Sequence, residues 1–232
     1  MYALGMMAST AIIAPLVIIS FPMSFAWRYQ LTRYWTRFNI WWLGKTCKLG
    51  YEISGLENVP SGPVIVLAKH QSSWETIFLH QLLPPVAWVV KRELLWIPFF
   101  GWALALVDPI AIDRKAYSAA AKQILEQGKQ HLAKGQWVLL FPEGTRTAPG
   151  ERRRYGAGGA RLAAHTGYPI LPIAHNAGEY WPRRSFIKYP GAIKVSIGPQ
   201  IDSTGRSVQE LISLTENWIE GAMQSIKAAQ KT

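Results

Sequence analysis

Two polar residues in the first third of the chain have the types and the order of a catalytic base and the acid that orients it. His70 follows an apolar run typical of a buried strand, and Glu75 comes five positions later. A separation of five does not place both residues on one helical face, where partners are three or four apart. We therefore expect His70 in the loop before a helix, and Glu75 in the first turn with its carboxylate on one imidazole nitrogen. The other nitrogen would then take a proton from a hydroxyl.

This spacing alone is weak evidence for a catalytic pair. With five histidines and 14 acidic residues in 232, chance supplies roughly 0.3 such pairs. A histidine at a strand end that only completes a local hydrogen bond would give the same pattern, so the alternative stays open.

A second block, LLFPEGTR at residues 139–146, leads from an apolar strand pattern straight into a polar turn. Arg146 carries a permanently charged, planar guanidinium suited to a phosphate. Gly144 permits a sharp turn and a close approach of the backbone. Glu143 has the reach to hold a neighbouring base in place. A well-made turn with a surface arginine is the alternative interpretation of this block.

Two further cations and one proline accompany these blocks. Lys91 and Arg114 each end a strand pattern, so they are candidates to join Arg146 around one anion, or else they are solvated strand ends. Pro172 lies inside the apolar run PILPIA, which suggests an edge strand or a bulge. No cluster of histidine and acid has the spacing of metal ligands, so we expect no metal. The single cysteine, Cys47, excludes an intramolecular disulfide and a CxxC motif.

Strand and helix patterns alternate from about residue 48 onward. Strands are expected near 51–55, 63–69, 86–91, 107–113, 136–141, 169–174 and 192–198, and helices from Ser72 or Ser73, at 116–134, at 160–166 and from Ser207 to Ala228. The apolar strand runs are typical of buried parallel strands. The sequence therefore predicts an α/β fold with a central, mostly parallel sheet flanked by helices.

The N-terminus differs from the rest of the chain. Residues 1–27 contain no charged residue and are long enough for a membrane helix, although Pro15 and Pro22 would kink or break it. A signal peptide is less consistent, because no Lys or Arg precedes the apolar run. Residues 28–45 follow as an amphipathic helix in the headgroup region, or alternatively as a helix whose apolar stripe of Leu31, Trp35, Phe38 and Trp42 packs on the globular domain. We expect a membrane-associated two-helix element at 1–46 and a globular domain at 47–232.

Composition narrows the class of protein. The chain is 49% hydrophobic and 17% charged, which excludes intrinsic disorder. Its formal charge of +11 favours an anionic partner, and 11 tryptophans favour a membrane over a nucleic acid. The aromatic residues gather beside the apolar N-terminus, whereas a nucleic-acid platform would interleave them with a basic groove. We therefore expect an anionic membrane and no nucleic acid as partners.

The four blocks, in this order, resemble the glycerolipid acyltransferase family, in particular its bacterial 1-acyl-glycerol-3-phosphate acyltransferases. The resemblance spans about residues 50–200 and rests on His70 with Glu75, on 91–101, on FPEGTR at 141–146 and on 171–173. It implies transfer of a fatty acyl group from acyl-CoA or acyl carrier protein to a lysophospholipid, without a further cofactor. The implied catalytic residues are His70 and Glu75, and the implied substrate-binding residues are Lys91, Arg114, Phe141, Pro142, Glu143, Gly144, Thr145, Arg146 and Pro172.

Two departures and two alternatives accompany this resemblance. The family's usual acid is aspartate, and the extra methylene of Glu75 lengthens the reach by roughly 1.5 Å. Where relatives often have a lysine and a glycine after FPEGTR, this chain has ERRRYGAGG, whose arginines contact phosphate or form a solvated basic loop. Acylation of another lyso-lipid, such as a lyso-ornithine lipid, and non-catalytic lipid binding both remain alternatives. The expected location is the inner (cytoplasmic) membrane, with the catalytic domain on its cytoplasmic face.

Overall fold

The computed structural model describes residues 1–229 and contains, within them, one seven-stranded sheet. The strands are β1 (Leu49–Ser54), β2 (Ile65–Ala68), β3 (Val86–Lys91), β4 (Ile110–Ile112), β5 (Trp137–Leu140), β6 (Ile170–His175) and β7 (Gly191–Ile197). Their order across the sheet is β1-β7-β6-β2-β5-β3-β4. Neighbours pair in parallel except β6 and β7, which are antiparallel. The predicted, mostly parallel α/β sheet is confirmed.

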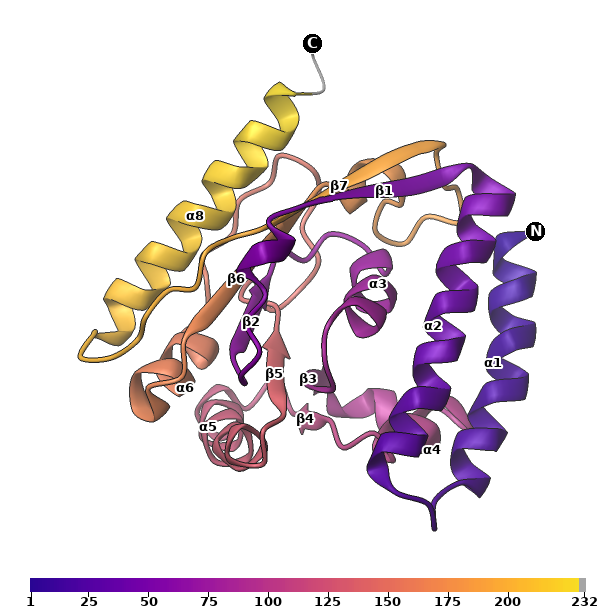
Figure 1. Ribbon diagram of the computed structural model, residues 1–232, viewed down its shortest axis with the longest axis horizontal. Coiled ribbons are helices and arrows are strands. Elements are labelled where there is room, and N and C mark those ends of the chain that lie inside the picture. The colour runs from indigo at the N-terminus through magenta and orange to yellow at the C-terminus, as the bar shows by residue number, and fades with distance from the viewer. Residues whose placement is uncertain (230–232) are drawn as a thin grey trace.

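Helices cover both faces of the sheet (Figure 1). α5 (Tyr117–Ala133), α6 (Gly158–Thr166) and α8 (Val208–Ala228) lie on one face, and α3 (Trp74–Leu82) and α2 (Phe25–Cys47) lie on the other. Successive side chains of a strand point to opposite faces. Accordingly, Ile65 and Leu67 of β2 pack with the α5, α6 and α8 layer, while Val66 and Ala68 pack with the α2 and α3 layer. β2 is thus buried on both faces, as its apolar run predicted.

The N-terminal apolar run forms a hairpin rather than one long helix. α1 (Tyr2–Ile19) runs antiparallel to α2 (Figure 1), and Pro22 lies in the turn between them. Arg28 stabilises this turn: its side chain donates to the carbonyls of Phe21 and Met23, and to Leu106 O at 3.0 Å just after α4 (Phe100–Ala105). α1 is long and apolar enough to cross a membrane by length and composition, and only 17% of it is buried inside the protein. It is therefore not a helix of the protein's own core.

The apolar stripe predicted for residues 28–45 packs mainly on the protein. Trp35 and Trp42 pack against the buried cluster beneath α3, and Trp35 Nε1 donates to Thr10 Oγ1 of α1 at 3.1 Å. Leu31 packs between α1 and α4. Phe38 alone of the stripe is exposed. The packing alternative therefore describes three of the four residues, which are half-buried against α1 and the globular body.

Two prolines, Pro109 and Pro172, lie within the apolar runs predicted as strands. Pro109 precedes β4, which is an edge strand. Pro172 lies in β6, an interior strand, so the edge alternative is wrong there. The pairing beside it is irregular: Ile170 and Ile173 are three residues apart, while their partners Ile201 and Ile197 are four apart. The extra residue of this bulge therefore belongs to the segment 197–201 and not to the strand that contains Pro172.

The remaining elements are short. They are the 3₁₀ helices η1 (Leu56–Asn58) and η2 (Arg92–Trp96) and the helix α7 (Ala177–Tyr180). The longest helix of the covering layer, α8, begins with a capped turn in which Ser207 Oγ accepts from Glu210 N at 3.2 Å. This cap fixes the start of a helix whose later residue, Glu220, extends to the candidate site.

Candidate active site

The candidate site lies where three central strands end. β5, β2 and β6 are adjacent and parallel, so their carboxyl ends meet at one edge of the sheet. His70 follows β2, the segment 141–146 follows β5, and His175 ends β6. The two blocks that sequence predicted as parts of one site are therefore brought together by strand order.

His70 and Glu75 form the predicted pair. His70 lies in the loop before α3, Glu75 lies in the first turn of α3, and His70 Nδ1 is 2.8 Å from Glu75 Oε1. The fully buried carboxylate also accepts from the backbone amides of Gln71 at 2.9 Å and Ser72 at 2.8 Å. Burial would raise the pKa of Glu75, but His175, the hydrogen bond from His70 and the Ser72 amide outweigh it, so this pKa is lowered. An ionised Glu75 makes Nδ1 the donor and leaves Nε2 of His70 as the acceptor.

The orientation of His70 is fixed from two further sides. The Phe141 ring stacks on the imidazole, with centroids 3.8 Å apart and planes 8° from parallel. Thr147 holds the backbone of His70, because its amide and its hydroxyl both donate to His70 O, at 2.8 and 3.1 Å. Only 7% of His70 is exposed. The arrangement is that of a general base held in one rotamer and one tautomer.

His175 lies next to this pair. Its Nδ1 accepts from Ala177 N at 3.2 Å, so its Nε2 is the donor to Lys69 O at 2.8 Å. The ring is fully buried, and this burial lowers its pKa. Nε2 of His175 is 4.0 Å from Glu75 Oε2. Both ring nitrogens of His175 have partners, so it packs behind the pair and does not present a free base.

Two arginines meet beside the predicted base. Arg114 Nη1 donates to Gly144 O. Burial lowers the pKa of Arg114, and the nearby charge of Arg146 lowers it further. Arg183, which sequence reasoning missed, donates from Nη1 to Arg146 O at 3.0 Å. The turn that carries Gly144 and Arg146 is thus held on both sides by guanidinium groups.

The other predicted substrate-binding residues differ in their surroundings. Lys91 is exposed and pairs with Glu93 Oε1 at 3.1 Å. The Glu93 charge also acts on Arg114, where it opposes the fall of the pKa. Pro142 is buried, and Thr145 is half-buried beside Arg146. Pro172 is buried within the sheet, three residues before the strand end at His175. Arg114 therefore interacts with Arg146 and also with Glu93, the partner of Lys91.

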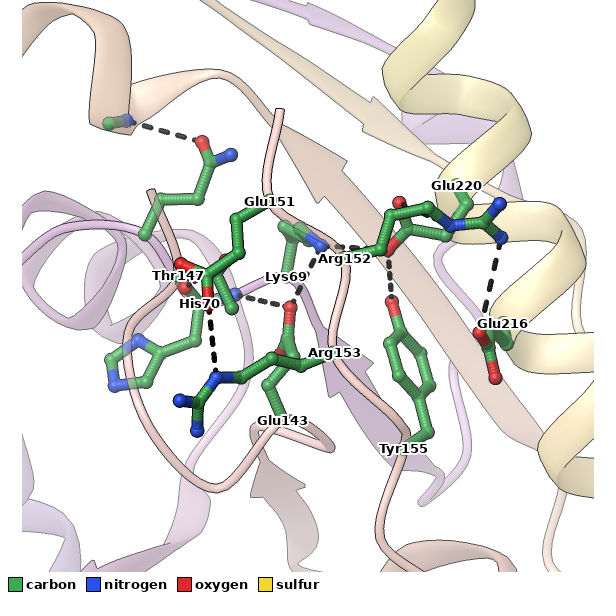
Figure 2. A network of polar contacts seen from close by, with 12 residues as sticks. Lys69, His70, Glu143, Thr147, Glu151, Arg152, Arg153, Tyr155, Glu216 and Glu220 are labelled. Atoms are coloured by element: carbon green, nitrogen blue, oxygen red, sulfur yellow. Dashed lines mark hydrogen bonds and ion pairs between the residues drawn. The ribbon is translucent and has the colours of Figure 1, made fainter. Parts of the chain in front are cut away.

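Glu143 points into the protein (Figure 2). Its Oε1 lies 3.1 Å from Lys69 Nζ and accepts from His70 N at 3.4 Å. Burial raises the pKa of Glu143, and the Lys69 charge opposes this rise. Glu143 therefore holds the backbone of the predicted base, as expected, while its carboxylate has interior partners.

Lys69 joins the site to α8 and was missed by sequence reasoning. Lys69 is 1% exposed, and its Nζ lies 2.7 Å from Glu220 Oε1 on α8 (Figure 2). Tyr155 Oη donates to the same oxygen at 3.1 Å, and Arg152 Nε lies 3.6 Å from Glu220 Oε2. A lysine directly after a buried strand was the available signal, since a buried ammonium requires carboxylate partners.

A mostly apolar cavity of about 370 Å³ adjoins the arginine side of the site. Arg146, Ser73 and Thr76 contribute to its polar end. The rest of its wall comes from the hairpin helices, α3, β3 and α4, and includes Ile13, Val17, Trp35, Ile77, Trp88 and Leu104. Arg146 thus lies at the wall of an apolar cavity that has room for a hydrocarbon chain.

Known proteins resemble this chain in both sequence and fold. The profile of the Acyltransferase family matches residues 50–176. The 1-acyl-sn-glycerol-3-phosphate acyltransferase of Pseudomonas aeruginosa is 47% identical over 213 residues, which cover 90% of this chain and 83% of that protein. The 1-acyl-sn-glycerol-3-phosphate acyltransferase alpha of Mus musculus is 30% identical over 173 residues, covering 72% of this chain and 60% of that protein.

The fold comparison extends over the whole chain. The crystal structure of the 1-acyl-sn-glycerophosphate (LPA) acyltransferase PlsC from Thermotoga maritima superposes with a TM-score of 0.77 at 21% identity, covering 98% of each chain. That likeness shows the shared fold, hairpin included. With the family profile and the bacterial relative, it leaves one conclusion: the chain belongs to the acyltransferase family.

Proposed function

We propose that this acyltransferase moves a fatty acyl group from the thioester of acyl-CoA or acyl carrier protein to the free hydroxyl of 1-acyl-glycerol-3-phosphate, giving phosphatidic acid. The observation that carries the proposal is the His70–Glu75 pair beside Arg146, at the ends of adjacent strands. The names of the bacterial and mouse relatives support the same acceptor.

The proposed chemistry uses one base and no covalent intermediate on the protein. His70 Nε2 takes the proton of the acceptor hydroxyl as its oxygen attacks the thioester carbonyl. The C–S bond then breaks, and the imidazolium returns the proton to the leaving thiolate. Glu75 stabilises the imidazolium through Nδ1. Arg146, with Arg114 beside it, neutralises the phosphate of the acceptor, and the adjoining apolar cavity accommodates an acyl chain.

The hairpin α1–α2 is proposed to hold the enzyme at the cytoplasmic membrane, on its cytoplasmic face. Exposed apolar residues on the outer side of the hairpin include Leu4, Met7, Ile12, Leu16, Ile19, Trp27, Phe38 and Trp41. Because α2 packs on α3 and returns toward the globular body (Figure 1), the hairpin fits one leaflet better than a full crossing. Trp96, Phe99 and Trp102 near α4 extend this exposed aromatic surface.

An assay of the purified protein in defined lipid tests the proposed reaction. Lysophosphatidic acid and a panel of acyl-CoA and acyl carrier protein thioesters should give phosphatidic acid and free thiol in equal amounts. Product from a lyso-ornithine lipid but not from lysophosphatidic acid would replace the acceptor. Binding of lipid without release of thiol would instead favour a non-catalytic lipid-binding protein.

Variants of Glu75 test the orientation of the base. Glu75→Ala removes the carboxylate and is expected to lower kcat by about 100-fold, because the imidazolium loses its partner. Glu75→Asp keeps the charge and should stay within about tenfold of wild type, if the start of α3 shifts to recover the shorter reach. The measurement is kcat at saturating substrates. Equal kcat values for wild type, Asp and Ala would show that Glu75 does not orient His70.

The lowered pKa of Glu75 also predicts a pH effect on stability. A carboxylate whose folded pKa lies below its unfolded value stabilises the fold above the unfolded value. That contribution is lost as the pH falls through the folded pKa. The stability difference between wild type and Glu75→Gln, measured by denaturant titration, should therefore be largest near neutrality and shrink in acid.

Arg146 is expected to act on one substrate more than on the other. Arg146→Ala should raise KM for the phosphate-bearing acceptor by about 10-fold to 100-fold, since a charge-assisted contact to phosphate is lost. KM for the acyl donor should change much less. Arg161→Ala, an exposed arginine on α6, is the matched control. A larger effect on the donor would move Arg146 to the donor site.

A further inference from the structure

The loop between α7 and β7 presents two bare apolar side chains to solvent. Phe186 is 91% exposed and Ile187 is 61% exposed. The segment 182–190 reads PRRSFIKYP, with three cations and no acidic residue. A turn presents the two side chains: Ile187 N donates to Ser185 Oγ at 3.0 Å, and Lys188 Nζ donates to Phe186 O at 3.0 Å. The loop tip is thus an ordered apolar projection with cations on both sides.

This loop is attached to the start of the hairpin at one end. Lys188 Nζ lies 4.5 Å from the ring centre of Trp181 and 5.3 Å from that of Tyr2, the first residue of α1. The Tyr2 and Trp181 rings also meet edge to face, with centroids 5.2 Å apart. In Figure 1 the gold segment before β7 lies near the N-terminus of α1. Lys188 thus connects the loop to the start of α1, the helix that carries the exposed apolar residues Leu4 and Met7.

The other end of the loop is attached to the candidate active site. Arg183 donates to Arg146 O, as described above, and Arg184 next to it is exposed. Cations beside an apolar tip match an anionic bilayer, in which phosphates lie just above the acyl chains. This combination of exposed Phe and Ile with an excess of positive charge favours a bilayer over a protein partner.

We propose that residues 183–189 form a second bilayer contact, in which Phe186 and Ile187 enter the acyl region of an anionic membrane while Arg183 and Arg184 lie at the headgroup phosphates. The contact places the Arg146 turn at the level of the headgroups, so an acceptor lipid reaches the site without leaving that layer. The route of the acceptor lipid rests on the proposed function, whereas the bilayer contact itself does not.

The depth of the loop is measured on the full-length protein bound to vesicles. Phe186→Cys in a Cys47→Ser background leaves one thiol for an environment-sensitive fluorophore, because Cys47 is the chain's single cysteine. In phosphatidylglycerol-containing vesicles its emission should shift to the blue and be quenched by spin labels on the acyl chains. The matched control is Gln224→Cys, which is exposed on α8, and its emission should stay that of a probe in water.

Two results of this measurement would overturn the bilayer contact. A probe at position 186 that stays water-like while the protein is bound to vesicles shows that the loop does not insert. A blue-shifted probe that acyl-chain spin labels fail to quench shows that protein, a second copy included, covers the loop.

Kinetic constants for two kinds of acceptor test whether the loop gives the acceptor lipid access to the site. The double variant Phe186→Ser, Ile187→Ser should raise KM about tenfold for a long-chain acceptor presented in vesicles. It should leave kcat/KM unchanged for a short-chain acceptor dissolved in water. Equal losses on both acceptors would mean that the loop only supports the site and would overturn this role. If wild type shows no acyl transfer at all, the proposed function fails, and the fluorescence measurement still decides the bilayer contact.

Discussion

Replacing His70 with alanine is expected to lower kcat by about 10²-fold to 10⁴-fold while the protein stays folded. Nε2 of His70 is the acceptor nitrogen of the candidate site, since Glu75 occupies Nδ1. Without it, the acceptor hydroxyl must lose its proton to water during the attack on the thioester. KM values should change little, because Arg146 and the apolar cavity remain. Release of thiol from acyl-CoA, with and without acceptor, is the measurement.

The matched control for this variant is His165→Ala. His165 is exposed on α6, and its ring contacts only the carbonyl of Arg161 among the interactions of the described chain. Its activity should equal that of wild type. If His70→Ala loses stability along with the stacking on Phe141, His70→Asn keeps a polar side chain and separates folding from chemistry. A folded variant with near wild-type turnover refutes the assignment of His70 as the base.

Strand patterns and motif order predicted much of this molecule for a physical reason. A parallel sheet places the carboxyl end of every strand at one edge, so polar residues that follow apolar runs must gather there. His70 after β2 and Arg146 after β5 met this condition and lie at adjacent strand ends. Glu75 was placed correctly because a five-residue separation excludes a shared helical face.

Contacts between residues that lie far apart in the sequence could not be predicted in this way. Glu220 follows Lys69 by 151 residues, and nothing in either local pattern names the other. Arg183 comes from a loop whose path the sequence does not specify, and it meets Arg146 through a backbone carbonyl that any residue would supply. Lys91, a strand-end cation, pairs with the nearby acid Glu93, which lies only two residues away in the sequence.

Lys69→Met is expected to destabilise the fold by about 3–5 kcal/mol at neutral pH. The ammonium lies between Glu143 and Glu220, 3.1 and 2.7 Å away, and its removal leaves two buried carboxylates facing each other. Lys122→Met is the control: Lys122 pairs with Glu126 on the exposed face of α5, where an ion pair contributes about 0.3–0.5 kcal/mol. Denaturant titration of both variants gives the comparison.

The pH dependence of Lys69→Met identifies the cause of its instability. Burial raises the pKa of Glu143, and the Lys69 charge opposes that rise, so this pKa should rise further in the variant. A carboxyl whose folded pKa exceeds its unfolded value binds more protons when folded, so lowering the pH through the folded pKa restores stability. The loss of unfolding free energy in Lys69→Met should therefore be smaller at pH 5 than at pH 8. Adding Glu220→Gln to Lys69→Met should recover part of this loss. A loss that is independent of pH would mean that lost packing, rather than unpaired charge, destabilises the variant.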